Sequence, residues 1–448
     1  MVPLIKKIIR EDNFLSLSGN LVIAVFGFGG FALLARSLTP DEFAKWVLFI
    51  SGGSLIEMLR YGITNNGLVR FLSGANKEEQ EHLIGANVLV SLLVTVVLVG
   101  IMTAVYFGFK TTIDDSAYAI FFRWYPVLAF LNLPLNNALV VQQAKMQYGK
   151  ILLIRAISST FFFTFLVVNY FYLDLLINQI VIAFLIFTVI TSVFCILKSW
   201  DGLSLIRQAN KQSINTLLNF GKYSTFTLIG TNLLRNADVI IISVSPFGSA
   251  AVALFSIPLK LTELQQIPLR SFAATAYPKM SKASIEGRVW DVKNLFNTYS
   301  GALTYLFFFL SLGTFIFARE FIILVSGYQY LDVAVHGIDI VMIVQILSVY
   351  GLLLPIDRMT GISLDSINRP NINALKVLIM LSLNIVGDLV AIYVFESIEM
   401  VAVSTLVFTA AGIIVGCYFL TKTFPISFSG IFKSANGFYK NLFLKIAK

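Results

Sequence analysis

The chain has 448 residues, of which 57% are hydrophobic and only 13% charged, and its mean hydropathy is +0.82. Because soluble domains typically carry about 25% charged residues, this composition excludes an ordinary soluble protein and indicates an integral membrane protein. The formal net charge of +9 fits the basic cytoplasmic loops of such a protein, so we expect no nucleic-acid partner.

A bilayer core about 30 Å thick requires roughly 20 apolar residues per helix, and windows of this length recur along the chain. Their apolarity is continuous rather than alternating, which favours an all-α protein over an outer-membrane barrel. We expect about twelve transmembrane helices of this length, at residues 14–35, 43–63, 83–109, 117–141, 151–173, 177–197, 223–244, 250–267, 298–317, 337–354, 372–395 and 399–421.

Basic residues indicate the orientation, because Lys and Arg near span ends stay on the cytoplasmic side of the membrane. With the N-terminus inside, most of the 33 basic residues fall in inward-facing segments. The outward loops hold Arg36, Lys45, Lys110, Arg123 and Arg319. This asymmetry predicts an even number of spans in the inner or plasma membrane, with both termini in the cytoplasm. Mixed apolar and basic residues at 1–13 predict a short interfacial helix in contact with membrane lipids.

An internal repeat divides the chain into two halves. Residues 133–150 and 354–371 align without gaps and share a Leu-Pro kink followed by a polar turn, and 43–73 resembles 250–281 more weakly. Six spans separate the matched elements, so the halves should be related by a pseudo-twofold axis along the membrane normal. We therefore expect two six-helix bundles at 1–198 and 223–421, a cytoplasmic linker at 199–222 and a basic amphipathic cytoplasmic tail at 422–448.

Enzyme signatures are scarce. The two histidines, His82 and His336, are expected on opposite faces of the membrane, and the sequence has no Walker-type loop, His-Glu-x-x-His pair or Gly-x-Ser-x-Gly turn. Cys195 and Cys417 both fall in predicted spans, which disfavours a disulfide framework or a metal cluster. We expect a protein that is not an enzyme and has no catalytic residues, cofactor or metal.

Charges inside the apolar windows are the strongest clue to function. A rise of 1.5 Å per residue puts Arg235 roughly 18 Å from the inner end of its helix, and Asp238 follows one turn later. On the next helix, Lys260 lies roughly 15 Å and Glu263 roughly 20 Å from the outer end. A charge near the bilayer centre costs about 2.5 to 3.5 kcal/mol, so these residues should face a partner or a wet cavity.

Two other spans carry charges. Glu57 and Arg60 stand three residues apart in the second span, and Asp388 stands alone in the eleventh. One interpretation is that the acid–base pairs neutralise each other and lock helices together. The other is a polar lumen, in which arginine suits phosphate because its planar fork binds oxygens bidentately and keeps its charge. A lone intramembrane carboxylate often marks an ion or proton site.

Several short motifs resemble those of one family. They are ARSLTPDEF at 35–43, YGITNNGLVR at 61–70, DVIII at 238–242 with SPFGSA after it, and AYPKMS at 276–281. Together they resemble the polysaccharide-transporter family of O-antigen and exopolysaccharide flippases. This is the Wzx-like branch of the multidrug/oligosaccharidyl-lipid/polysaccharide (MOP) superfamily, in which multidrug transporters of the MATE type have two six-helix bundles.

The resemblance implies a flippase that moves an undecaprenyl-diphosphate-linked glycan from the inner to the outer leaflet by alternating access. It implies protons or Na⁺ as the driving ion, and a polysaccharide polymerase and a chain-length regulator as partners. Arg235 would hold a diphosphate or acidic sugar, and Asp238 would hold Arg235 in place. The candidate substrate-binding residues are Arg235, Asp238, Lys260, Arg60 and Arg270. The candidate ion-coupling residues are Asp388, Glu57 and Glu263.

Two alternatives stay open, one within transport and one from a different class. A cation-coupled multidrug exporter of the same superfamily would favour a lumen lined by carboxylates, whereas the residues near the midplane here include basic ones. A membrane glycosyltransferase or polymerase would carry large catalytic loops outside the membrane, and the predicted outer loops are short.

Overall fold

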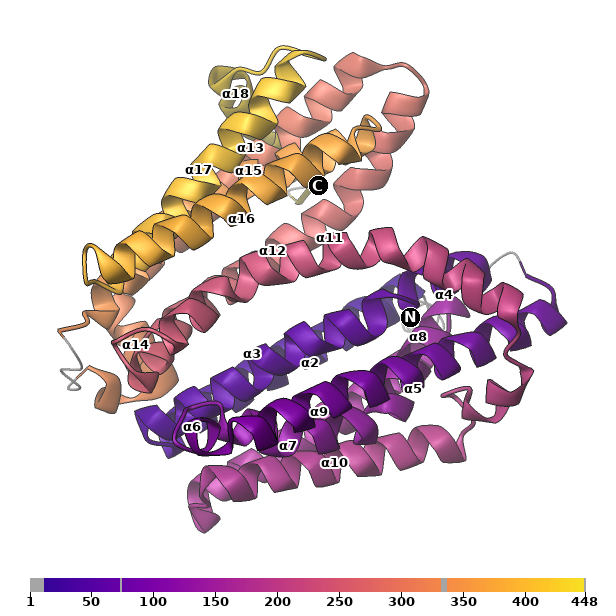
Figure 1. Ribbon diagram of the computed structural model, residues 1–448. Helices are drawn as coiled ribbons and strands as arrows, with labels where there is room; N and C mark the ends of the chain where they lie inside the picture. Colours follow the sequence, from indigo (N-terminus) through magenta and orange to yellow (C-terminus); the bar gives the residue numbers. More distant parts are fainter. Residues whose placement is uncertain (1–11, 73–74, 332–336, 447–448) are drawn as a thin grey trace. The chain divides into compact units, whose positions relative to one another are not determined.

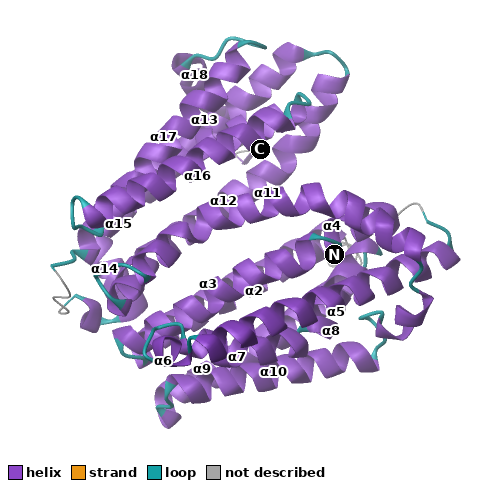
Figure 2. Ribbon diagram, in the orientation of Figure 1, coloured by secondary structure: helices purple, strands orange, loops and turns teal. Residues whose placement is uncertain are grey.

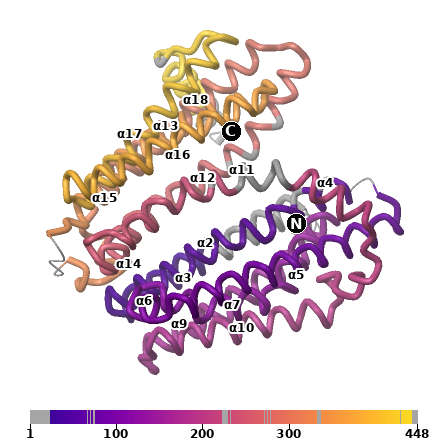
Figure 3. Tube along the Cα trace, viewed as in Figure 1, coloured from indigo at the N-terminus to yellow at the C-terminus, as the bar shows by residue number. Residues whose placement is uncertain are grey.

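The computed structural model describes residues 12–72, 75–331 and 337–446, which form α-helices with short 3-10 and π segments (Figures 1 and 2). The backbone divides into two compact units, Met1–Asn232 and Leu233–Lys448. We call them unit 1 and unit 2 and describe each by itself. Figure 3 traces the chain in order through both units.

Unit 1 begins with α2 and ends within α11, and its long helices α2 and α9 pack along each other. Its elements are α2 (Asp12–Ser37), α3 (Pro40–Gly62), α4 (Asn65–Leu72), α5 (Lys77–Gly108), α6 (Lys110–Asp114), α7 (Ala119–Leu131), α8 (Leu133–Ala144), α9 (Tyr148–Val168), η1 (Asn169–Leu173), α10 (Ile177–Leu197), η2 (Leu203–Gln208) and the first part of α11 (Lys211–Ser243). A buried core that includes Leu68, Ile84, Val141 and Leu217 joins α4, α5, α8 and α11.

Unit 2 is centred on α15, which packs against α12, α13 and α17. Its elements after α11 are α12 (Ser249–Ile285), α13 (Val289–Ile316), α14 (Ala318–Ser326), η3 (Tyr328–Tyr330), α15 (Ile340–Ser366), α16 (Pro370–Tyr393), α17 (Glu399–Thr421) and α18 (Phe428–Ile446). Its buried core includes Met280, Phe296, Phe307 and Met359.

Each of the twelve predicted windows coincides with a helix or a pair of consecutive helices. Seven of the described helices are long and apolar enough to cross a membrane, and the bent pair α7–α8 adds an eighth. Helices α3, α11 and α12 are less apolar because they carry the charged residues singled out above. The prediction of an all-α, multi-pass membrane protein is confirmed.

The two Leu-Pro positions of the repeat have different local structures. Helices α7 and α8 meet at an angle of 50°, because Pro134 in the first turn of α8 lacks an N–H donor and its ring crowds the preceding turn. In unit 2, Pro355 lies inside α15, and the helix continues through it. Only the first position interrupts its helix.

The segment 199–222, expected as a linker, packs on unit 1. Gln142 Nε2 donates to the carbonyl oxygen of Trp200 at 3.0 Å, and His82 Nδ1 lies 2.6 Å from the carbonyl oxygen of Gln208. A Cβ atom at Gly85 would lie 2.2 Å from the carbonyl oxygen of Leu205, so the close approach of α5 and η2 requires glycine. The two units divide later, between Asn232 and Leu233 inside α11.

The predicted tail forms α18, which packs along α13 of unit 2 (Figure 1). Tyr439 Oη donates to the carbonyl oxygen of Ala302 at 2.8 Å, and Tyr305 Oη donates to Asn436 Oδ1 at 3.0 Å. The tail is therefore part of the folded unit. The interfacial helix expected within residues 1–13 lies almost entirely outside the described residues.

Candidate functional site

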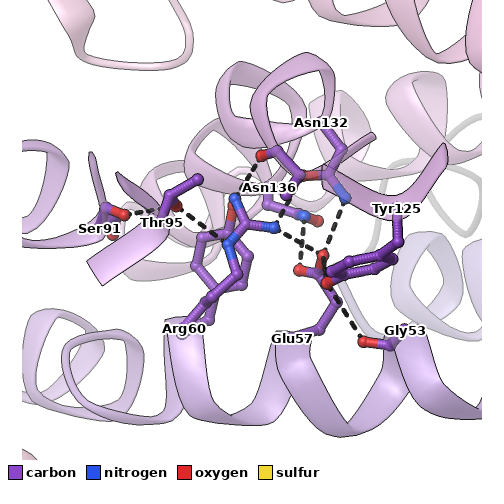
Figure 4. Close-up of polar contacts among 10 residues, drawn as sticks. Gly53, Glu57, Arg60, Ser91, Thr95, Tyr125, Asn132 and Asn136 are labelled. Atoms are coloured by element: carbon purple, nitrogen blue, oxygen red, sulfur yellow. Dashed lines mark hydrogen bonds and ion pairs between the residues drawn. The ribbon is translucent and has the colours of Figure 1, made fainter. Parts of the chain in front are cut away.

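The first charged cluster is built around Arg60 on α3 of unit 1 (Figure 4). The Arg60 side chain is 0% exposed, and its Nη1 atom lies 2.7 Å from Glu57 Oε1. This confirms the pair expected from the spacing of three residues. The guanidinium partners are Glu57 Oε1, Thr95 Oγ1, Asn132 Oδ1, Tyr61 Oη and the carbonyl oxygen of Ala129, at 2.5 to 3.1 Å. An arginine side chain has five N–H donors, so Arg60 has none left for a substrate in this structure.

Glu57 is equally well bonded. Besides Arg60, its Oε1 atom accepts from Tyr125 Oη at 2.8 Å and Asn132 Nδ2 at 2.9 Å, and its Oε2 atom accepts from Asn136 Nδ2 at 3.1 Å. Tyr125 comes from α7 and Asn136 from α8, so the carboxylate ties α3 to both halves of the bent pair (Figure 4). A buried charge is stable where it is paired and hydrogen-bonded in this way.

A cavity of about 560 Å³ lies beside this cluster, within unit 1. Among the described residues that line it, Glu57 is the one charged side chain. The uncharged polar lining residues include Ser54, Asn65, Asn136 and Gln143, and aromatic rings and aliphatic side chains form the rest of the wall. The volume is in the range of about 300 to 1,000 Å³ that is usual for small-molecule sites.

The second charged cluster, in unit 2, is centred on Glu263 of α12. Glu263 Oε2 lies 2.7 Å from Lys260 Nζ, which confirms that predicted pair. Glu263 Oε1 accepts from Arg235 on α11, through Nε at 3.2 Å and also through Nη2. One carboxylate therefore holds two basic side chains from two helices.

The predicted pairing of Arg235 with Asp238 is wrong. The Arg235 side chain is 56% exposed and reaches α12, whereas Asp238 is 5% exposed and accepts a hydrogen bond from Asn384 of α16. Two residues three apart on a helix share a face only approximately, and here Arg235 bonds to a residue of α12 whereas Asp238 bonds to a residue of α16. Glu263, an ion-coupling candidate from the sequence, is the carboxylate to which Arg235 bonds.

Two more arginines lie near this cluster. Arg270 of α12 and Arg358 of α15 are both exposed, and Arg270 is close enough to Arg235, Arg358 and Glu263 to be influenced by their charges. We call Arg235, Lys260, Arg270 and Arg358 the basic face of unit 2. Arg270 is one of the substrate-binding candidates from the sequence, whereas Arg358 is not.

The third cluster brings together two carboxylates that are far apart in the sequence. Asn384 Nδ2 donates to Asp238 Oδ1 at 2.7 Å and to Asp388 Oδ2 at 3.3 Å. Asp388 and Asn384 are both fully buried, and Asp388 Oδ1 and Asn384 Oδ1 have no hydrogen-bond partner among the described residues. Two adjacent buried carboxylates cannot both stay charged without a shared proton or a cation. Asp388, which is the one carboxylate in the sequence of its span, therefore contacts Asn384 and has Asp238 as a further neighbour.

A buried ion pair that sequence analysis missed joins α15 and α16. Lys376 is 3% exposed, and its Nζ atom lies 2.6 Å from Asp357 Oδ1 and 2.9 Å from Thr360 Oγ1. The pair links α15 to α16. In the described part of the chain, no group of three His, Cys, Asp or Glu residues is placed to hold a metal ion.

Comparison with known sequences identifies one family. The model of the family described as "Polysaccharide biosynthesis protein" matches residues 9–284, which include α3, Arg235, Lys260 and Arg270. No curated protein matches the sequence.

Solved structures of MOP superfamily proteins are similar in fold. They include an inward-facing multidrug resistance transporter of the MATE family (TM-score 0.71, 16% identity, covering 90% of this chain and 96% of that chain). Lipid II flippase MurJ in an inward closed conformation is similar over 96% of this chain and 92% of its own (TM-score 0.71, 15% identity). A MOP superfamily transporter from Pyrococcus furiosus is similar over 92% of this chain and 94% of its own (TM-score 0.63, 16% identity). The predicted MATE-like fold is confirmed.

Proposed function

The chain belongs to the polysaccharide biosynthesis protein family, and from this premise we propose that it is a flippase for lipid-linked oligosaccharides. It moves a glycan carried on an undecaprenyl-diphosphate-type lipid from the inner to the outer leaflet by alternating access. The reaction breaks no covalent bond, so the protein has to supply recognition, a polar path and a conformational cycle.

The observation that carries this proposal is the basic face of unit 2. Arg235 lies on a helix of a membrane protein and is 56% exposed, with Arg270 and Arg358 exposed nearby. Exposed charges at such depth are costly, so they require an anionic partner or water. A diphosphate is a compact anion whose oxygens match the bidentate fork of arginine. Several arginines on one face therefore favour a lipid diphosphate over a cationic drug.

Glu263 positions the substrate-binding side chains. By accepting hydrogen bonds from both Arg235 and Lys260, it fixes the directions of the two side chains. The Arg235 side chain is 56% exposed, so it is the group that would meet the diphosphate. This assigns to Glu263 the positioning role that the sequence had suggested for Asp238.

The pair Asp238 and Asp388 is proposed as the coupling site for a proton or Na⁺. The two unpartnered oxygens of Asp388 and Asn384 are acceptors that a cation can occupy, as sodium and other hard cations prefer oxygen ligands. Asp238 and Arg235 lie three residues apart on α11. A cation that binds at Asp238 therefore acts on the same helix that presents Arg235 to the substrate.

We also propose the setting in which this cycle operates. The distribution of Lys and Arg favours a location in the cell inner membrane with both termini cytoplasmic. A polysaccharide polymerase and a chain-length regulator would then receive the glycan at the outer surface. Cysteines introduced at exposed positions in 199–222, such as Gln212, should resist an impermeant reagent applied to intact cells, and efficient labelling would contradict this orientation.

The direct test uses the full chain purified into vesicles. A fluorescent undecaprenyl-diphosphate glycan is placed in both leaflets, and its exposure to an impermeant quencher is followed in time. The proposal predicts that the protein moves the inner-leaflet pool outward much faster than empty vesicles do. If the vesicles instead transport cationic dyes and leave the lipid-linked glycan in place, the protein is a multidrug exporter.

A further inference from the structure

The cavity of unit 1 has a chemistry different from that of the basic face. Its one charged lining residue, Glu57, already accepts four hydrogen bonds, one of them from the buried Arg60. The charge of the carboxylate is therefore compensated within the protein. Neither a cation nor an anion would find an unmatched charge in the cavity.

Uncharged hydrogen-bonding groups are available in the same cavity. The Gln143 side chain is exposed and makes no hydrogen bond within the described part of the chain. Asn65 Oδ1 is buried and has no hydrogen-bond partner among the described residues. Ser54 Oγ accepts from Asn232 at 3.2 Å and can still donate. A buried amide oxygen without a partner is destabilising unless a ligand or water bonds to it.

Apolar surface accompanies these groups. The lining includes Phe49, Tyr125 and Phe184 as well as Leu128 and Val140. A pyranose ring presents C–H groups on its faces and hydroxyl or acetamido groups around its edge, so it needs such a mixture of apolar walls and amides. A lipid chain would leave the free amide groups without partners, which costs free energy.

We propose that this cavity binds an uncharged sugar residue of the transported glycan, through Asn65, Gln143 and Ser54. The inference rests on the proposed function and divides recognition between the units. The basic face of unit 2 takes the diphosphate, and the cavity of unit 1 takes the sugar.

The experiment measures the binding of the lipid diphosphate and the binding of the glycan separately, with the full chain in lipid nanodiscs. The first probe is undecaprenyl diphosphate. The second is the free glycan released by mild acid from the polyprenyl-diphosphate lipids that accumulate in cells lacking the protein. Binding is titrated by ligand-observed NMR for the glycan and by native mass spectrometry for the lipid. The variants are Asn65→Leu with Gln143→Leu, the matched surface control Gln212→Leu, and Arg235→Ala.

The double variant should bind the free glycan about tenfold more weakly, because it removes two uncharged hydrogen bonds. Its affinity for undecaprenyl diphosphate should stay within about twofold of wild type, which also shows that it is folded. Gln212→Leu should bind both probes normally. Arg235→Ala should lose undecaprenyl diphosphate and keep the glycan.

Three outcomes would overturn the inference. If the double variant keeps its glycan affinity, the sugar does not bind in this cavity. If wild type binds undecaprenyl diphosphate but no glycan, the cavity is not a sugar site and the proposed function stands. If wild type binds neither probe, or no such lipids accumulate, the proposed function fails and the inference fails with it.

Discussion

Arg60 in unit 1 and Arg235 in unit 2 look alike in the sequence, since each stands three residues from an acid inside an apolar window. In the structure they differ. Arg60 is 0% exposed and has all five N–H groups bonded, whereas Arg235 is 56% exposed and shares Glu263 with Lys260. This difference favours a structural role for Arg60, and it leaves the exposed Arg235 as the substrate contact that we propose. The same spacing of charges can give a buried, fully bonded arginine or an exposed one, and the partners from neighbouring helices determine which of the two forms.

The largest effect should come from breaking the pair in unit 1. Glu57→Leu leaves the Arg60 charge buried and uncompensated, which should lower the free energy of unfolding by about 3 to 5 kcal/mol. The measurement is membrane abundance together with the thermal unfolding midpoint of the purified protein. The double replacement Glu57→Leu with Arg60→Met should recover much of the loss, because no buried charge remains. A stable Glu57→Leu protein would mean that Glu57 is not a structural partner of Arg60.

In unit 2, Glu263→Gln should reduce flipping with little effect on abundance. The charge that fixes Arg235 and Lys260 is lost, and we expect about a tenfold slower rate, as for the loss of a charge-assisted hydrogen bond. Asp238→Asn is the comparison, because Asp238 contacts Asn384 rather than Arg235. Flipping and the binding of undecaprenyl diphosphate are both measured in vesicles with protein amounts matched. If Asp238→Asn weakens diphosphate binding as much as Glu263→Gln does, Glu263 is not the residue that positions Arg235.

A smaller effect on the overall rate is expected at Asp388. Asp388→Asn keeps the size of the side chain but removes one of the two carboxylates, so transport should lose its stimulation by a proton or Na⁺ gradient and retain the unstimulated rate. Asp365→Asn, at the end of α15, is the matched control, since Asp365 is bonded to Asn373 outside this cluster. Unchanged ion dependence in Asp388→Asn would make Asp388 a structural residue.

The smallest effect concerns Asp201, between α10 and η2. Burial raises the pKa of the Asp201 carboxyl, so the folded state favours its protonated form. The stability contributed by this proton is present at low pH and is lost as the pH rises from the ordinary carboxyl pKa through the raised one. We therefore expect the unfolding midpoint of Asp201→Asn, measured relative to that of wild type, to be higher at pH 7 than at pH 4. An equal difference at both pH values would exclude this carboxyl as a source of pH dependence.

Much of the fold could be predicted because the apolar composition of a segment is enough to determine that segment's own secondary structure in a bilayer. A run of about 20 apolar residues must form a helix in a bilayer, so the twelve windows coincide with helices. The boundary between the units could not be predicted in the same way. It lies inside α11, where the chain is helical on both sides, whereas the polar segment 199–222 packs on unit 1.

The charged residues of the three clusters were found from the sequence, but half of their contacts were not, and the pair of Lys376 with Asp357 was missed. Glu57 with Arg60 and Lys260 with Glu263 are local pairs, and spacing was enough. Arg235 with Glu263 and Asp238 with Asn384 depend on which helices pack against α11, which no spacing within one helix determines. Asn132 and Asn136 were not among the residues singled out, although Asn residues at a helix break beside a Pro could have signalled a bonded cluster.

The most direct test of the account compares two arginines that are equally exposed. Arg235 and Arg288 are 56% and 53% exposed, and both pair with carboxylates, but Arg288 bonds to Glu286 and Asp291 at the start of α13, outside the apolar windows. The measurement is the rate of glycan-lipid flipping in vesicles by Arg235→Ala and Arg288→Ala, at equal protein and with thermal unfolding as the check of fold. The account predicts that Arg235→Ala abolishes flipping and Arg288→Ala does not change it. Full activity of a folded Arg235→Ala protein would contradict it.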